Sequence, residues 1–374
     1  MVLTVLVVLP TAALFLRVLN ETSEQRSNTD LAKQGVEYLG ALGGLITSLA
    51  ESQSSALQNV SAEPASLTAA VARVQGVDER LGEDLDTSQR WAGLKEKIGR
   101  LPGVTGTSEE IFQAHVEVSD LALALYATVR ENSTLNRDPE SDVWFLQQAV
   151  AVDMPETVTR VSRMGDLANM YAAAKRSQKP ATFARFGYEV LAVQEAAAEL
   201  TDNLQEAAND TDSATLSGNL VQNLDRFRRG VEAANRGANF AGGVPDVSAM
   251  VTAQSTLTTA LAALSNAVLT EMNTLLEDRS DEQTYRTIEA WALLGVAVAL
   301  ILVATFWTRS RGRQTSAPAA ANDSREVSVQ GDNTGSGPAG GAYGGSPYDP
   351  VPNYGEMPRY GDSASRQERS GALR

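Results

Sequence analysis

Residues 290–308 read AWALLGVAVALILVATFWT, a run of nineteen residues without a charged side chain. As a helix that rises about 1.5 Å per residue, this run is long enough to cross a hydrocarbon core of about 30 Å. A second apolar stretch occupies residues 2–19 and contains one charged residue, Arg17. The sequence therefore predicts transmembrane helices at residues 1–19 and 290–308, separated by a polar region of residues 20–289.

The charges beside the second apolar segment predict its orientation. Arg309, Arg311 and Arg313 follow it directly, whereas residues 281–289 before it carry three carboxylates and one arginine. Basic residues next to a transmembrane helix stay in the cytoplasm. We therefore expect a two-pass protein of the inner or plasma membrane, with both termini in the cytoplasm and residues 20–289 outside.

The first apolar stretch has two interpretations. An uncleaved transmembrane helix is favoured, because the stretch lacks a basic n-region and no clear small-x-small cleavage site follows it. The alternative is a cleaved signal peptide, which leaves residues 20–289 on the same side of the membrane. The missing n-region also leads us to expect that the start of the chain is incomplete.

Composition excludes several kinds of chemistry. The chain contains no cysteine and one histidine, His115, which excludes disulfides, a structural zinc site and a cysteine nucleophile. No phosphate-binding loop, dinucleotide-binding loop or cluster of metal ligands is present in the sequence. We therefore predict a protein that is not an enzyme and holds no cofactor and no metal. The net charge of −15, concentrated outside the nearly neutral tail, would repel nucleic acid and anionic lipid.

The polar region reads as helix almost throughout. Apolar residues recur at spacings of three and four, and no alternating strand pattern appears. One such stripe is Leu257, Leu261, Leu264, Val268 and Leu275, and another is Ile111, His115, Val118, Ala122, Leu125 and Val129. Stripes of this kind pack against partner helices. The prediction is an all-α fold, an elongated antiparallel bundle of one or two stacked four-helix layers.

Local signals place the helix boundaries. Ser108 is expected to cap one helix, and Asp138 to cap another that has Pro139 at its first position. Pro155 lies inside the following helix and should kink it. A chain that leaves and re-enters one membrane face needs an even number of antiparallel passes, so we expect an additional break at residues 209–212.

The segment after the second apolar run has a different composition. Residues 331–371 contain ten of the 29 glycines and four of the nine tyrosines. Such a segment buries too little apolar surface to offset the entropy lost on ordering. We therefore expect residues 309–374 to form a disordered cytoplasmic tail without an enzymatic output domain.

Several separated motifs resemble one known group of proteins. They are QGVEYL at residues 34–39, RWAGLK at residues 90–95, the Asp-Pro turn and paired aromatic residues within residues 132–146, and LLEDR at residues 275–279. In this order they resemble the extracytoplasmic all-helical sensor regions of bacterial chemoreceptors, sensor histidine kinases and diguanylate cyclases. The resemblance covers roughly residues 20–310 and implies a helical sensor bundle that is often a homodimer.

The chain departs from that group in two ways. Residues 51–54 read ESQS where relatives usually carry a His-Arg-Gly-like element, and no signalling domain follows the second membrane segment. We therefore expect a sensor-like membrane protein that binds a small solute or partner and relays helix shifts to a separate cytoplasmic signalling protein. The alternative is a non-sensing scaffold that dimerises through the bundle and recruits partners with its tail.

Four residues are candidates for ligand binding: His115, Arg137, Asp138 and Trp144. His115 is either a hydrogen-bonded core residue or a buried group that responds to pH near neutrality. Trp144 and Phe145 are either core anchors, with Asp138 as a helix cap, or parts of a ligand pocket at the Asp-Pro turn. A polar pocket inside the bundle would favour the sensor interpretation, and a wholly packed core would favour the scaffold.

Overall fold

The computed structural model describes residues 2–58, 64–211, 214–239 and 244–311. It separates the chain into one compact unit, residues 1–309, and a second unit from residue 310 onward. The predicted disordered tail lies outside the described residues, apart from its first three positions. The helices are α1 (Val2–Leu57), α2 (Ala65–Leu81), α3 (Ser88–Arg100), η1 (Leu101–Gly103), α4 (Ser108–Asn132), η2 (Leu135–Arg137), α5 (Ser141–Gln148), η3 (Ala149–Asp153), α6 (Met154–Ala173), α7 (Lys179–Asp210), α8 (Ala214–Ala238) and α9 (Val247–Arg311).

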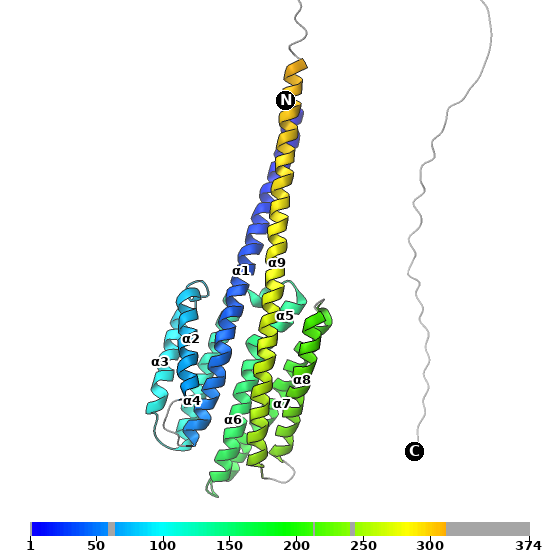
Figure 1. The fold of residues 1–374 in the computed structure, drawn as a ribbon. Helices are drawn as coiled ribbons and strands as arrows, with labels where there is room; N and C mark the ends of the chain where they lie inside the picture. The colour runs from blue at the N-terminus through cyan, green and yellow to red at the C-terminus, as the bar shows by residue number, and fades with distance from the viewer. Residues whose placement is uncertain (1, 59–63, 212–213, 240–243, 312–374) are drawn as a thin grey trace, which may run out of the picture. The chain divides into compact units, whose positions relative to one another are not determined.

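The all-α prediction is confirmed for the described residues, which contain helices and no strand. The chain runs up and down in antiparallel passes, with α5, η3 and α6 forming one continuous pass (Figure 1). The predicted extra break separates α7, which ends at Asp210, from α8, which begins at Ala214. Residues 212 and 213 of that break lie outside the described residues.

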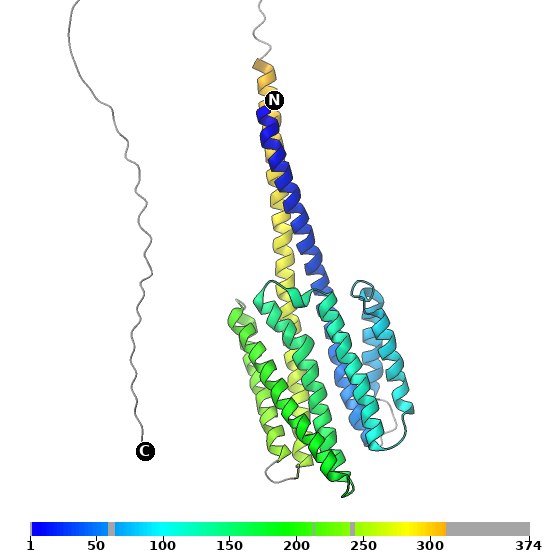
Figure 2. The same cartoon turned by 180° about the vertical axis from the view of Figure 1, so that it is seen from behind.

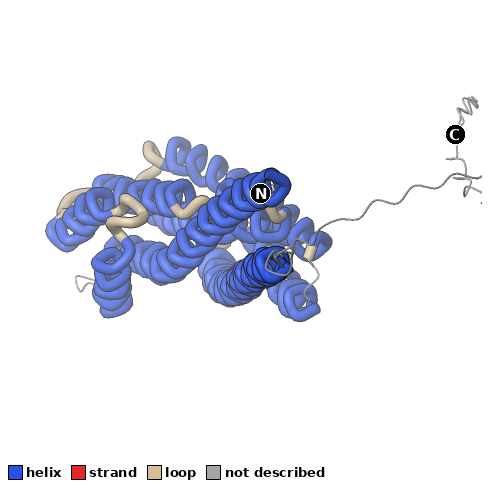
Figure 3. Tube along the Cα trace, turned by 90° about the horizontal axis from the view of Figure 1, so that it is seen from above, coloured by secondary structure: helices blue, strands red, loops and turns tan. Residues whose placement is uncertain are grey.

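The passes form two groups that lie side by side along the same length of the bundle (Figures 1 and 2). One group contains the C-terminal part of α1 with α2, α3 and α4, and the other contains α5 to α8 with the N-terminal part of α9. The view along the bundle shows the same lateral arrangement (Figure 3). The two four-helix groups are therefore placed next to each other, whereas the sequence prediction allowed for stacking along the bundle axis.

Burial follows the predicted stripes. On α9, Leu257, Leu261, Leu264 and Val268 are buried, and Leu275 packs against the core from a partly buried position. On α4 the stripe is buried from His115 to Val129. Pairs of helices meet along these stripes because side chains three and four residues apart lie on one face.

Two predicted caps differ from the structure. The N-cap of α4 is Thr107 instead of Ser108, and its hydroxyl accepts from the Glu110 N–H while the Glu110 carboxylate accepts from the Thr107 N–H. This reciprocal pair satisfies two N–H groups at the helix start. Asp138 does not cap a helix, because α5 begins at Ser141. It accepts from the Glu140 N–H and stabilises the turn before α5.

The resemblance motifs have structural roles in this chain. Gly35 lies where α1 meets the end of α4, and a Cβ there would come within 2.3 Å of Ser133 Cβ. Tyr38 is buried and donates to Asp78 at 2.9 Å. Trp91 is buried and donates from its indole nitrogen to Gln75 at 2.8 Å. These residues therefore hold α1, α2, α3 and α4 together. This packing role accounts for the residue types at these positions, so ligand binding is not needed to explain them.

The N-terminal half of α1 and the C-terminal half of α9 continue beyond the bundle beside each other (Figures 1 and 2). Phe15 and Trp291 meet edge to face there, with ring centroids 5.3 Å apart. Apolar side chains of α9 are exposed from Ile288 to Trp307, a pattern that a water-facing helix rarely shows. Among the described residues, α9 is the one helix long and apolar enough to cross a membrane. Side chains before Ala12 lie outside the described residues, so the first span stays a prediction.

Candidate functional site

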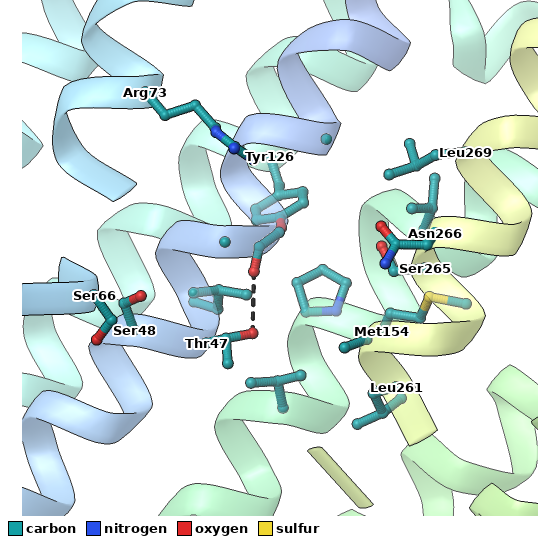
Figure 4. A pocket seen from close by; sticks show the side chains of 18 of the residues that line it. Thr47, Ser48, Ser66, Arg73, Tyr126, Met154, Leu261, Ser265, Asn266 and Leu269 are labelled. Atoms are coloured by element: carbon teal, nitrogen blue, oxygen red, sulfur yellow. Dashed lines mark hydrogen bonds between the residues drawn. The ribbon is translucent and has the colours of Figure 1, made fainter. Parts of the chain in front are cut away.

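A cavity of about 350 Å³ lies where the two groups of helices meet. We call it the central cavity. Its walls come from α1, α2, α4, η3, α6 and α9, and Figure 4 shows Tyr126 on one side and Ser265, Asn266 and Leu269 on the other. Its volume is within the range of pockets that hold small ligands. The lining residues are Gly40, Gly43, Gly44, Ile46, Thr47, Ser48, Glu51, Ser66, Arg73, Tyr126, Val150, Met154, Pro155, Val158, Leu261, Ala262, Ser265, Asn266 and Leu269.

Missing side chains on α1 create the space. Gly40, Gly43 and Gly44 recur at helical spacing on the face of α1 that lines the cavity. A Cβ at Gly43 would lie 3.7 Å from Ser265 Oγ and 4.0 Å from the Tyr126 hydroxyl, and one at Gly44 would meet nothing within 4 Å. Glycine inside a helix costs roughly 0.5–1 kcal/mol relative to alanine. These positions therefore keep a cavity open at some expense of helix stability.

The most unusual group in the cavity wall is the Tyr126 hydroxyl. The side chain is 2% exposed, and no described residue forms a hydrogen bond with the hydroxyl. Burial raises the pKa of Tyr126 above its usual range, so the hydroxyl remains a protonated donor at physiological pH. The hydroxyl oxygen itself is not fully enclosed by protein and opens onto the cavity, whereas most polar groups of buried side chains are paired. Tyr126 therefore presents an unused donor to the cavity.

Two of the other polar groups of the cavity are bonded, whereas the Ser48 and Ser265 hydroxyls form no hydrogen bond with a described residue. Thr47 donates to the Gly43 carbonyl at 3.0 Å, the dashed line in Figure 4. Glu51 accepts from Ser66 at 2.8 Å. Glu51 and Arg73 are the charged residues of the lining, and both are exposed at its edge. The inner part of the cavity is therefore uncharged.

The wall opposite α1 contains a π-helical turn, η3, directly before Pro155. The Met154 N–H donates to the Ala149 carbonyl five residues earlier, and Pro155 has no N–H for the next carbonyl, that of Val150. The predicted proline kink therefore takes the form of a π-turn that accommodates Pro155 within the pass. Such turns often occur at functional sites, and Val150, Met154 and Pro155 all line the central cavity.

A second polar region lies where α1 and α9 leave the bundle. Arg279 of α9 donates from both terminal nitrogens to the Asp138 carboxylate, at 2.7 and 2.9 Å, and also pairs with Glu140 at 3.0 Å. We call Arg279, Asp138 and Glu140 the clamp. The side chains of Asp138 and Arg279 are 4% and 14% exposed. A bidentate pair of this burial fixes the Asp-Pro turn against α9.

The clamp borders a polar pocket of about 490 Å³. Residues 24–29 of α1 form another part of its wall. Its lining includes Arg137, Thr29 and Gln283, and Gln283 donates to the Thr29 hydroxyl at 3.1 Å. Four carboxylates and three arginines line it, so neither sign of charge predominates strongly. Its groups connect α1, the Asp-Pro turn and α9, which indicates a structural role.

The four candidate residues from the sequence do not form one site. Arg137 and Asp138 lie together in the clamp pocket. His115 is buried in α4 away from both pockets, with Nδ1 2.9 Å from the Ile111 carbonyl oxygen, and burial lowers its pKa. Trp144 is 36% exposed and packs edge to face on Phe145, so its predicted role as a core anchor is wrong.

A third polar cluster lies near the C-terminal end of α1, within residues 51–54. Gln53 and Ser54 of α1 each donate to the Asp166 carboxylate of α6 at 2.8 Å. Asp166 is 2% exposed, and burial raises its pKa to about 6 despite these hydrogen bonds. These hydrogen bonds join the two groups of helices, and Gln53, Ser54 and Asp166 do not line the central cavity.

Sequence reasoning missed the central cavity and Tyr126. The one available signal was the cluster of glycines on α1, which interrupts an otherwise strong apolar helix. Comparisons with protein-family models, with curated proteins and with solved structures find no match for this chain.

Proposed function

We propose that the chain is a membrane-anchored, sensor-like protein whose bundle binds a small solute in the central cavity. Binding shifts α1 relative to α9, and a separate signalling protein detects that shift. One observation carries the proposal: α1 and α9, which wall the cavity, are also the two helices that continue beyond the bundle (Figure 1). A ligand that contacts both helices can act on the membrane end through them.

The presence of a cavity supports solute binding over a pure scaffold. A scaffold needs a packed bundle and a surface for partners, and it gains nothing from three glycines that open its interior. Known helix shifts in signalling proteins are small, about 1–2 Å. A ligand produces such a shift only through a difference in its affinity for the two arrangements. A site shared by α1 and α9 provides that difference.

Ligand binding can be tested with the full-length protein in lipid nanodiscs. A library of small metabolites is screened for compounds that raise the unfolding temperature, because a ligand that binds only the folded state stabilises it. The expected result is a compound that stabilises the wild type and has a reduced effect on Gly43→Leu, which fills the cavity. Stabilisation of both proteins to the same extent would place binding elsewhere.

The proposed topology can be tested because the chain has no native cysteine. Glu83→Cys places a thiol in the exposed turn between α2 and α3, and Asn322→Cys places one in the proposed cytoplasmic tail. In intact cells without an outer barrier, a membrane-impermeant maleimide should label the first variant and spare the second. Labelling in the opposite pattern would reverse the orientation and remove the basis of the sensor proposal.

The relay to a partner makes a separate prediction. Deletion of residues 314–374 should leave the unfolding temperature and solute affinity unchanged, because every helix that the structure describes ends before that range. The deletion should abolish recovery of a cytoplasmic partner by cross-linking. If the shortened protein retains its partners, the tail is not the contact site and the membrane helix or the outer surface has that role.

A further inference from the structure

We infer that the central cavity selects an uncharged ligand with an apolar body and a hydrogen-bond acceptor that receives the Tyr126 hydroxyl. The inference rests on the proposed function and specifies the chemical class of the solute. Three observations carry it: the unpartnered donor, the uncharged interior and the apolar lower wall.

The donor determines which polar group the ligand carries. Tyr126 is buried, lines the cavity and has no hydrogen-bond partner among the described residues. Its hydroxyl lies near the position that a Gly43 Cβ would occupy, so the missing side chain leaves room for a ligand atom beside it. A carbonyl or ether oxygen placed there would accept from the hydroxyl. The bond would remove the desolvation cost of that group.

The charge distribution excludes an ionic ligand from the interior. The charged residues of the lining, Glu51 and Arg73, are exposed at its edge, and Glu51 already accepts from Ser66. An ion that entered the interior would lose its hydration without gaining a counter-ion, which is strongly unfavourable. A neutral molecule avoids this cost.

The lower wall determines the body of the ligand. Met154 of α6 and Leu261 of α9 face the cavity, and both lie below Asn266 in Figure 4. Ile46 and Val158 complete this wall, and all four are buried. Contact with these side chains removes apolar surface from water in proportion to the area covered. A ring or short branched chain next to the acceptor satisfies both ends of the site.

The test compares three small probes of similar shape on the full-length protein in nanodiscs. Acetophenone has a neutral acceptor, α-methylstyrene replaces the carbonyl oxygen with carbon, and benzoate carries a negative charge. Affinities come from titration calorimetry, with empty nanodiscs titrated in parallel to subtract partition into lipid. Acetophenone should bind about tenfold more tightly than α-methylstyrene, the effect of one hydrogen bond, and benzoate should bind most weakly.

Tyr126→Phe removes the hydroxyl and keeps the ring. It should abolish the difference between acetophenone and α-methylstyrene by weakening acetophenone alone. Tyr188→Phe is the matched control, because Tyr188 is a tyrosine exposed on α7 away from the cavity, and it should leave all three affinities unchanged. An unchanged acetophenone preference in Tyr126→Phe would overturn the inference.

A cavity variant separates this inference from the proposed function. Gly43→Leu should weaken every probe, and Gly43→Ala is the fallback if the leucine variant does not fold, because its methyl group would make only ordinary contacts. If benzoate binds most tightly and Gly43→Leu weakens it, the cavity is a binding site and the ligand class is wrong. If no probe or metabolite depends on position 43, both the inference and the proposed function fail.

Discussion

The clamp and the central cavity are two polar regions beside the same long helices, and they differ in how the oxygen atoms of one side chain in each are bonded. In the clamp, Asp138 receives two hydrogen bonds from Arg279 and its carboxylate is almost fully covered. In the cavity, the Tyr126 side chain is also buried, but its hydroxyl opens onto the cavity and forms no hydrogen bond with a described residue. A carboxylate held by two charge-assisted hydrogen bonds fixes helices in place, whereas an unpartnered hydroxyl in a cavity wall leaves a position for another molecule. The following variants test that distinction.

The largest effect is expected at the clamp. Arg279→Met keeps much of the side-chain volume but leaves Asp138 as a buried carboxylate without its cation. Breaking a buried pair in this way typically costs about 3–5 kcal/mol. The measurement is the free energy of unfolding in denaturant, followed by circular dichroism in detergent.

Arg286→Met is the control for the clamp, because Arg286 pairs with Glu282 on the exposed surface of α9, where ion pairs contribute little. Its unfolding should match that of the wild type. An equally small loss in Arg279→Met would show that the clamp does not hold the Asp-Pro turn.

Two tyrosines allow the same comparison with one chemical change. Tyr38 donates to Asp78, so Tyr38→Phe should lower the free energy of unfolding by about 1.5 kcal/mol, the usual value for a hydrogen bond to a charged group. Tyr126→Phe removes a hydroxyl without a partner and should leave the unfolding free energy unchanged or slightly higher. Equal losses in the two variants would mean that the Tyr126 hydroxyl is satisfied in the ligand-free protein.

The sequence predicted the parts of the fold that depend on local pattern. The apolar stripes predicted which faces of α4 and α9 are buried, and the break after α7 followed from the need for an even number of passes. The capping box of Thr107 and Glu110 was also readable as Thr-x-x-Glu, although Ser108 was predicted as the cap. These features depend on residues within one or two helical turns.

The sequence did not predict the features that depend on distant contacts. The cavity forms because glycines of α1 face Ser265 of α9 and Tyr126 of α4. The hydrophobic periodicity of one helix does not indicate which residues of other helices it will face. The lateral placement of the two groups has the same origin, since Gln53 of α1 meets Asp166 of α6 across 113 positions. Asp138 was a candidate from its turn alone, but its partner Arg279 lies in another helix.

The Asp166 cluster predicts a pH dependence of stability. Its pKa is about 6 in the folded protein, above the usual value of 3.8, so the folded state binds the proton more tightly than the unfolded state. This penalty is absent below about pH 4, grows as pH rises to about 6 and is constant above that. Between pH 7.5 and pH 5, acidification should therefore raise the free energy of unfolding by on the order of 1 kcal/mol through this group.

Asp166→Asn removes the titrating group and retains an acceptor for Gln53. His115 contributes with the opposite sign, because its lowered pKa makes acidification destabilising, so the informative quantity is the difference between wild type and variant at each pH. That difference should be larger at pH 7.5 than at pH 5, with the variant relatively more stable at the higher pH. A difference that does not change with pH would show that Asp166 is ionised throughout this range.

The smallest effect is expected at Pro155, on the cavity wall. Pro155→Ala supplies an N–H that can donate to a carbonyl of the η3 turn, which favours the helix, but it removes a buried ring that lines the cavity. The two effects oppose each other, so the free energy of unfolding should change by less than about 1 kcal/mol in either direction. Solute affinity should change more than stability, because the substitution alters the shape of the cavity and leaves the clamp untouched. A gain of several kcal/mol would instead show that the proline is a source of strain, and that the π-turn is maintained for reasons unrelated to the packing of the bundle.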